Sequence, residues 1–244
     1  MAIKAVISDI YTTLIDIKTD ESNPDIYSRL ASYLKYQGVY LSADELKWFF
    51  FEKKAMQKKA STEEYPEVDY RSIWQDILHE NLYRPSGERS DGSAFVPDII
   101  RLHRSLSVEK IKLYRGVFET LDRLKQRYRL GIVSDSQPDH AYPELQMLGI
   151  HGFFNAIIVS AEHGYRKPDV RLFEECLGRL GVTPSESVYL GNDTFRDVKG
   201  AKDAGMKAVL IMTKYGQKSG NATPDFIIDK IEEIDDVLKG MDEK

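Results

Sequence analysis

From about residue 106 onward, short apolar runs alternate with stretches in which hydrophobic residues recur at helical spacing. The apolar runs are LGIVS (130–134), AIIVS (156–160), SVYLG (187–191) and AVLIM (208–212), and a similar run opens the chain around 3–8. Helix-like stretches follow three of them, around 138–148, in DVRLFEECLGRL and in DVKGAKDAG. Nearly continuous apolar strands separated by helices are typical of a parallel sheet covered on both faces. The pattern therefore predicts an α/β fold.

The segment from about 19 to 108 has a different pattern, with helical spacing and few strand candidates. Its helix-like stretches are NPDIYSRLASYLKYQGV, SADELKWFFFEKKAMQKK, VDYRSIWQDILHENL and VPDIIRLHRSL. Ser42 precedes one of them with Glu45 three residues later, which is the arrangement of a capping box. We therefore predict two domains: an α/β domain made of 1–18 and 109–244, and an all-helical domain, 19–108, inserted after the first strand.

Composition and charge are those of a soluble protein with a proper core. Of the 244 residues, 42% are hydrophobic and 30% charged, and the net charge is −5. An acidic balance argues against a nucleic-acid-binding protein, which would normally present a basic face. Neither a membrane-length apolar run nor a secretory signal is visible in the sequence, and the single cysteine, Cys176, excludes an internal disulfide and a cysteine metal cluster. We expect a cytoplasmic protein without membrane or nucleic-acid partners.

Polar residues follow four of the predicted strands at the point where each strand ends. Asp9 follows AVIS, Ser134 ends LGIVS, Lys167 lies in the loop after AIIVS, and Asp193 follows SVYLG. The carboxyl ends of parallel strands form the ligand crevice of an open sheet, so these side chains are expected to converge. A carboxylate, a hydroxyl, an ammonium group and a second acid can together bind an anion and attack it. The sequence therefore predicts a small-molecule anionic substrate.

The residues around these positions resemble the four motifs of the haloacid-dehalogenase-like hydrolases. The matching segments, in order, are DIYTTL, IVSDS, GYRKPDVRLFEECL and YLGNDTFRDVKGAKDAGM. The resemblance spans the α/β part of the chain, whereas the helical insertion matches the family's cap domain only in position and helicity. It implies a Rossmann-like parallel sheet covered by helices on both faces, with an inserted all-helical cap domain.

The resemblance also implies a role for each matching residue on the substrate side. Asp9 corresponds to the nucleophile, which forms a covalent aspartyl intermediate, and Thr13 to the threonine of the first motif. Ser134 corresponds to the hydroxyl that hydrogen-bonds the transferred group, and Asp135 is assigned with it to substrate binding. Lys167 corresponds to the cation that neutralises the transferred group.

On the metal side, the resemblance implies a Mg²⁺ ion held by Asp9, by Asp193 and by the main-chain carbonyl of Tyr11. Such an oxygen-rich site suits Mg²⁺. Asp197 corresponds to the second acid of the fourth motif, and we expect it to orient Lys167 or a water molecule rather than to bind the metal.

Tyr11 departs from the pattern of the family's phosphatases. They usually carry a second aspartate two residues after the nucleophile, as the general acid and base, and a glycine after it; this chain has Tyr11 and Thr12. A tyrosine with a pKa near ~10 is a poor substitute for a carboxylic acid in protonating an alkoxide at neutral pH, and general acid–base catalysis is commonly worth ~10²–10⁴ in rate. Hydrolysis of ordinary phosphomonoesters is therefore expected to be slow.

Three interpretations remain. The first is a metal-dependent phosphohydrolase of a small phosphorylated metabolite, whose leaving group needs little protonation, such as an acyl phosphate or phosphoanhydride, or whose acid comes from elsewhere. The second is a metal-independent 2-haloacid dehalogenase, because those enzymes resemble DIYTT and a departing halide needs no proton. Against it stand Asp193, Phe173 where they place a tyrosine, and FFFEKKAMQKK, which offers no match to their substrate-binding arginine. The third is a catalytically weak binding or regulatory protein. Either a monomer or a homodimer is compatible with the sequence.

Overall fold

The computed structural model describes residues 2–82, 92–216, 220 and 222–242. Its main sheet has six strands in the order β5-β4-β1-β6-β7-β8, and every neighbouring pair is parallel. The strands are β1 (Ala5–Ser8), β4 (Arg129–Ser134), β5 (Ala156–Val159), β6 (Ser187–Gly191), β7 (Lys207–Ile211) and β8 (Phe226–Ile228). The predicted α/β fold with a parallel sheet is confirmed.

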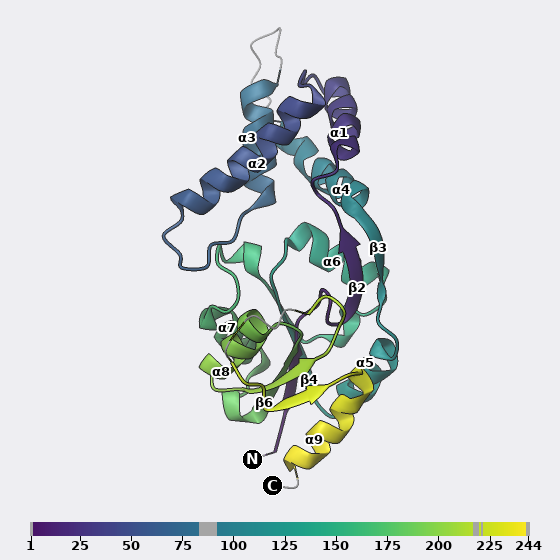
Figure 1. Cartoon of the computed structure of the whole chain (residues 1–244), viewed down its shortest axis with the longest axis vertical. Helices are drawn as coiled ribbons and strands as arrows, with labels where there is room; N and C mark the ends of the chain where they lie inside the picture. The colour runs from purple at the N-terminus through teal and green to yellow at the C-terminus, as the bar shows by residue number, and fades with distance from the viewer. Residues whose placement is uncertain (1, 83–91, 217–219, 221, 243–244) are drawn as a thin grey trace. The chain divides into compact units, whose positions relative to one another are not determined.

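Helices cover both faces of this sheet, with α7 and α8 on one face and α5 and α9 on the other (Figure 1). Their bounds are α5 (Val117–Lys125), α6 (Pro138–Met147), α7 (Val170–Leu180), α8 (Gly200–Asp203) and α9 (Ile234–Asp242). Short 3₁₀ turns lie at η2 (His151–Phe153), η3 (Ser160–Glu162), η4 (Pro184–Glu186) and η6 (Ile231–Glu233), and η5 (Thr194–Lys199) is a π-helix.

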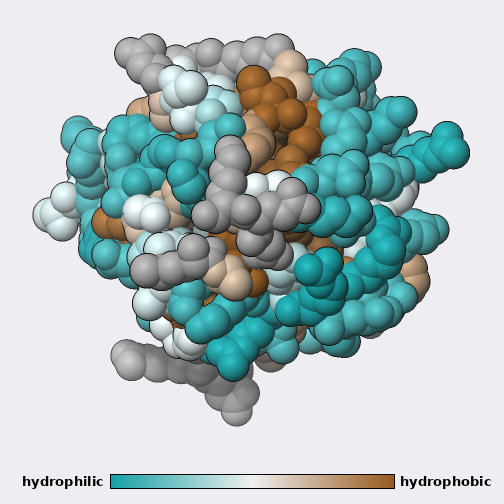
Figure 2. Space-filling view, turned by 90° about the horizontal axis from the view of Figure 1, so that it is seen from below, coloured by the Kyte–Doolittle hydropathy of each residue, from teal (hydrophilic) through white to brown (hydrophobic). Residues whose placement is uncertain are grey.

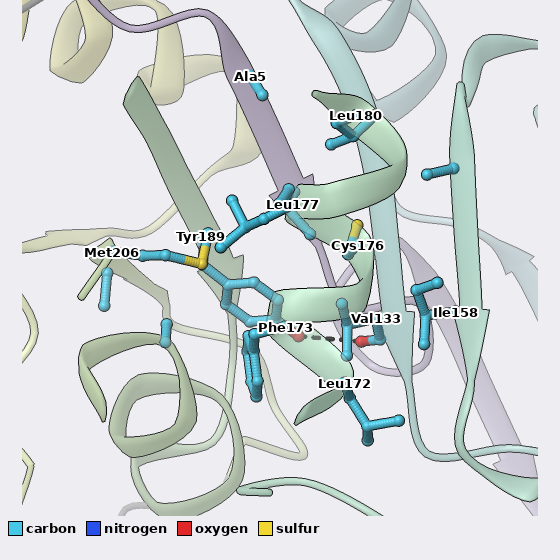
Figure 3. Close-up of a cluster of buried hydrophobic side chains, with 14 of the residues drawn as sticks. Ala5, Val133, Ile158, Leu172, Phe173, Cys176, Leu177, Leu180, Tyr189 and Met206 are labelled. Carbon is cyan, nitrogen blue, oxygen red and sulfur yellow. Dashed lines mark hydrogen bonds between the residues drawn. The ribbon is translucent and has the colours of Figure 1, made fainter. Parts of the chain in front are cut away.

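The core between α7 and the sheet explains why this helix forms where it does. Leu172, Phe173, Cys176, Leu177 and Leu180 recur at helical spacing and are all buried against the strands (Figure 3). The strand opposite them contains Gly131, where a Cβ atom would lie 2.7 Å from Cys176 Sγ. Glycine at this position therefore lets α7 pack directly on β4, and Cys176 is a buried hydrophobic residue, as its spacing predicts.

The chain forms two compact units, 1–17 with 111–244 and 18–110. The second contains α1 (Pro24–Tyr36), α2 (Ala43–Ala60), α3 (Tyr70–Asn81), η1 (Ser93–Phe95) and α4 (Val96–Ser107), and the chain enters and leaves it through a two-stranded sheet of β2 (Ile15–Thr19) and β3 (Val108–Leu113). The helices lie where the sequence predicts them, and the capping box at Ser42 is confirmed. Neither strand of this sheet was predicted from the sequence, because their short, half-polar runs gain their pairing only from each other.

The core of the helical unit contains a histidine enclosed by aromatic rings. His103 is 2% exposed, its ring lies 4.6 Å from that of Phe50 and 5.5 Å from that of Trp74, and its Nε2 has no hydrogen-bond partner among the described residues. Burial lowers the pKa of His103 from 6.5 to about 4, and the nearby charge of Glu21 only partly opposes this. The folded helical unit therefore holds a neutral imidazole.

We expect acid to destabilise the helical unit through His103. Between pH 6.5 and about 4 the unfolded chain binds a proton that the folded state does not, so stability is complete above pH 6.5 and falls as the pH falls. Between pH 7 and pH 4 the loss is about 3 kcal/mol. Urea unfolding at both pH values, followed by fluorescence of Trp74 and Trp48, measures it.

The His103→Leu variant isolates this contribution from that of the carboxylates, including Glu21, which faces His103 together with Lys54 and Arg104. Between pH 7 and pH 4 its free energy of unfolding should fall by about 3 kcal/mol less than that of the native chain. Equal losses in the two proteins would contradict a buried neutral histidine.

Most of the surface seen in Figure 2 is hydrophilic, with hydrophobic side chains gathered in smaller patches between polar ones. Within the described residues, none of the helices combines the length and the hydropathy needed to span a bilayer.

Candidate active site

The loop after β1 places Asp9 at the carboxyl edge of the sheet. Asp9 N–H donates to the carbonyl of Leu190 in the neighbouring strand, at 3.0 Å. Three amides from the following residues then turn back to the carbonyl of Ile10. The turn requires a positive φ of 61° at Thr12, a conformation in which a residue other than glycine is strained. Asn192 offsets this strain, because its Nδ2 donates to the Thr12 carbonyl at 2.7 Å.

The carboxylate of Asp9 is held at both oxygens. Lys167 Nζ lies 2.8 Å from Oδ1, and the hydroxyl of Thr13 donates to Oδ2 at 3.0 Å. Asp9 is only 7% exposed, and Lys167 only 3%. A buried carboxylate is costly unless it is paired and hydrogen-bonded, and here both conditions are met. A carboxylate oxygen has about two acceptor sites, so each oxygen of Asp9 retains one for a reacting group.

Lys167 joins Asp9 to a second buried acid. Its ammonium group lies 2.6 Å from Asp197 Oδ1 and 3.2 Å from the hydroxyl of Tyr189. Burial by itself would lower the pKa of Lys167, but the charges of Asp197 and Asp9 outweigh it and raise this pKa above its ordinary value. Lys167 is therefore a permanent cation beside Asp9.

Asp197 also organises the loop after β6. Its Oδ2 accepts the main-chain N–H groups of Asn192 and Asp193, both at 3.0 Å. It packs so closely on Gly191 that a Cβ atom there would lie 2.4 Å from the Asp197 carboxyl carbon. Burial raises the pKa of Asp197, while Lys167 opposes this shift. The two oxygens of one carboxylate thus fix both Lys167 and the loop.

Both oxygens of Asp193 accept hydrogen bonds from the residues that follow it in the chain. Its Oδ1 accepts the main-chain N–H groups of Phe195 and Arg196, both at 2.8 Å, and so caps η5. Its Oδ2 accepts Nε of Arg196, also at 2.8 Å. Acidic residues are favoured at such helix N-termini because their oxygens satisfy the unpaired N–H groups.

Ser134, the last residue of the neighbouring strand β4, and Asp135, which follows it, differ in their surroundings. The Ser134 hydroxyl oxygen accepts a long hydrogen bond of 3.5 Å from Ser136. Asp135 Oδ1 accepts the main-chain N–H of Lys167 at 2.8 Å, and its Oδ2 lies 3.4 Å from Nε of Arg166. Asp135 therefore holds the loop that carries Lys167.

Tyr11 lies two residues after Asp9, and its hydroxyl donates to Oε2 of Glu144 at 2.6 Å. Glu144 belongs to α6 and is 8% exposed. Hydrogen bonds from a hydroxyl to a carboxylate at this distance are charge-assisted and strong. The Tyr11 hydroxyl thus donates its single proton to Glu144.

The residues predicted to hold Mg²⁺ supply oxygen donors, the kind that Mg²⁺ prefers. Asp9 retains acceptor sites, whereas the Oδ2 atom of Asp193 already faces Arg196. In the part of the chain that the structure describes, no three His, Cys, Asp or Glu side chains lie close enough together to hold a metal ion by themselves. The donor set fits Mg²⁺ with main-chain oxygens and water as further ligands, and Oδ2 of Asp193, which accepts one hydrogen bond from Arg196, retains an acceptor site for the ion.

Several residues of this site went unnoticed in the sequence. Asn192 and Arg196 lie close to Asp193 within the fourth motif. Their place in the motif could be read from the sequence, but their hydrogen-bond partners could not. Tyr189 is a tyrosine in an otherwise apolar strand, which was only weak evidence for a role at the site. Its hydroxyl lies 3.0 Å from the Val133 carbonyl and 3.2 Å from Asp197, and so connects the core to the site (Figure 3). No feature of the sequence indicated that Glu144 belongs to the site.

Comparison with known sequences gives one family and several phosphatases. Residues 25–211 match the model of the family described as haloacid dehalogenase-like hydrolase. The glyceraldehyde 3-phosphate phosphatase of Methanothermobacter thermautotrophicus is 37% identical over 52% of this chain and 59% of its own length. Pyrophosphatase PpaX of Bacillus velezensis is 33% identical over 64% of this chain and 73% of its own length. The chain spans less than two thirds of the first of these relatives.

Solved structures agree with the fold. A HAD phosphatase from Thermococcus onnurineus is 25% identical, covers 98% of this chain and 99% of its own, and superposes with a TM-score of 0.62. A 2-haloacid dehalogenase from Pseudomonas syringae has a TM-score of 0.70 at 19% identity, covering 98% and 99% of the two chains. The latter likeness concerns the fold alone.

Proposed function

Because the chain belongs to the haloacid dehalogenase-like hydrolases, we propose that it is a phosphohydrolase acting on a small phosphorylated metabolite through an aspartyl phosphate. The observation that carries this proposal is the buried carboxylate of Asp9, fixed by Lys167 and Thr13 and retaining an acceptor site on each oxygen. The phosphatase names of the similar sequences favour it further. The helical unit, 18–110, would act as the cap domain, and the expected compartment is the cytoplasm.

In the first step an oxygen of Asp9 attacks phosphorus, the new O–P bond forms, and the bond from phosphorus to the leaving oxygen breaks with its electron pair going to that oxygen. Water then attacks the same phosphorus, so that phosphate and the free carboxylate of Asp9 are released. Lys167 supplies positive charge beside the oxygens on which negative charge develops, and the Ser134 hydroxyl can donate to them. These groups are fixed before the reaction, so little reorganisation is needed.

Mg²⁺, when bound, would neutralise charge on the phosphoryl oxygens. Asp9, the carbonyl of Tyr11 and Asp193 would hold the ion, and the positive charge of Arg196 beside the Oδ2 atom of Asp193 would oppose its binding.

We expect the Arg196→Gln variant to bind Mg²⁺ more tightly than the native chain. A partly exposed ion pair is worth up to about 1 kcal/mol, so its loss should strengthen binding by about fivefold. Isothermal titration calorimetry of the metal-free protein measures this without reference to activity. Arg171→Gln, which removes an ion pair with Asp169, is the matched control and should leave the affinity unchanged. An unchanged or weaker affinity in Arg196→Gln would remove Asp193 from the ligand set.

The experiment that tests the function is an assay of purified protein with acetyl phosphate, pyrophosphate, several phosphomonoesters and L-2-chloropropionate, each with Mg²⁺ and with EDTA. Phosphate release that EDTA abolishes is the expected result. Halide release unaffected by EDTA would overturn it in favour of a dehalogenase. Absence of turnover with every compound would favour a binding or regulatory protein.

A further inference from the structure

Resting on the phosphohydrolase proposed above, we propose that its substrates are acyl phosphates or phosphoanhydrides, because Glu144 withholds the Tyr11 proton from the leaving group. The leaving group must then depart as a stable anion. Glu144 is a specificity-determining residue in this sense, although it acts only through Tyr11.

The geometry of the Tyr11–Glu144 pair fixes the direction of the hydrogen bond. The two oxygens are 2.6 Å apart, with the Tyr11 hydroxyl as the donor and Oε2 of Glu144 as the acceptor. A hydroxyl has one proton, and it cannot serve Glu144 and a leaving group at once. Releasing it would leave a carboxylate that is 8% exposed without this partner, at a cost of about 1–3 kcal/mol.

The other proton donors beside Asp9 are also engaged. The Thr13 hydroxyl donates to Asp9 Oδ2. The three N–H bonds of Lys167 match its three partners, Asp9, Asp197 and Tyr189. Ser134 can still donate, but an aliphatic hydroxyl is far too weak an acid to transfer its proton to a leaving group. Among these groups none is free to act as the general acid.

The chemistry of the leaving group follows from this. When phosphorus is transferred to Asp9, an alkyl phosphomonoester must expel an alkoxide, which is strongly basic and needs a proton. An acyl phosphate expels a carboxylate and a phosphoanhydride expels a phosphate, and both are stable anions at neutral pH. Hydrolysis of the aspartyl phosphate likewise needs no general acid, because the leaving group is then the carboxylate of Asp9, a stable anion. Both hydrogens of the attacking water end on the released phosphate.

Acetyl phosphate and ethyl phosphate form the sharpest comparison, because they are similar in size and differ mainly in the basicity of the leaving group. An enzyme without a general acid loses the ~10²-fold or more that such a group contributes to the departure of an alkoxide. We therefore expect kcat/KM for acetyl phosphate to exceed that for ethyl phosphate by more than about 10²-fold. A series of aryl phosphates serves as the reference, and kcat/KM should fall steeply with leaving-group basicity. A flat series, with ethyl phosphate within tenfold of acetyl phosphate, would overturn the inference.

Variants of the pair provide a second test. Glu144→Leu frees the Tyr11 proton, so the ratio of the two kcat/KM values should fall by about tenfold or more. Glu144→Gln keeps an acceptor oxygen and should retain the native ratio. Adding Tyr11→Phe to Glu144→Leu removes the freed donor and should restore the native ratio, which a general loss of packing would not do. An unchanged ratio in a folded Glu144→Leu protein would contradict the role of Glu144.

These outcomes separate the two proposals. Phosphate release from neither acetyl phosphate nor pyrophosphate would defeat the proposed function itself. Release with no dependence on the leaving group would leave the phosphohydrolase standing and defeat only the inference about Tyr11 and Glu144. The native enzyme alone suffices for this distinction, so it does not depend on the folding of any variant.

Discussion

Replacing Asp9 by asparagine is expected to lower the rate of phosphate release by about 10³-fold or more, because an amide cannot form the aspartyl phosphate. Asparagine has nearly the same shape, and its Oδ1 can still accept from Lys167 and Thr13, which contact the two oxygens of Asp9. The loss should therefore appear in kcat rather than in folding. Steady-state assays with the best substrate of the panel, together with circular dichroism, measure both properties.

A matched control separates the nucleophile from a general effect of charge. Asp122 lies on the exposed side of α5, and Asp122→Asn changes the net charge equally without touching the site, so its activity should equal that of the native protein. If Asp9→Asn retained activity within tenfold of native, the covalent mechanism would be wrong.

Replacing Asp197 by alanine is expected to destabilise the α/β unit by about 3–5 kcal/mol, the cost of breaking a buried ion pair by removing one partner. The substitution leaves Lys167 with one acidic partner instead of two and frees the main-chain N–H groups of Asn192 and Asp193. It also opens a cavity against Gly191, which the carboxylate now fills. The effect is large because one 2%-exposed side chain carries all these interactions.

Urea unfolding followed by far-ultraviolet circular dichroism measures this loss. Fluorescence is the wrong probe, because both tryptophans, Trp48 and Trp74, lie in the helical unit. Asp203→Ala is the matched control: it removes the exposed ion pair between Lys199 and Asp203, and an exposed pair one helical turn apart is worth only about 0.3–0.5 kcal/mol. A loss of similar size in both variants would show that the buried charges around Lys167 do not stabilise the fold.

The sequence by itself determined the fold and the family, and both predictions are confirmed. The apolar runs of the strands and the helical spacing of α7 are local patterns, and each can be recognised within one short segment of the sequence. The convergence of Asp9 and Lys167 was also predictable, since parallel strands bring their carboxyl ends to one edge. The roles of the site residues and of the helical unit as a cap stay predictions.

Only the tertiary structure decided which partners the polar side chains take. Tyr11 and Glu144 are separated by 133 positions, and nothing in either segment indicates the other. Asp193 was visible as an acid, but whether its oxygens face a ligand or cap η5 depends on the path of the chain after β6. Strands β2 and β3 likewise exist only as a pair. A hydrogen bond depends on positions to within a few tenths of an ångström, and such positions are fixed by packing between distant segments rather than by the order of residues along one of them.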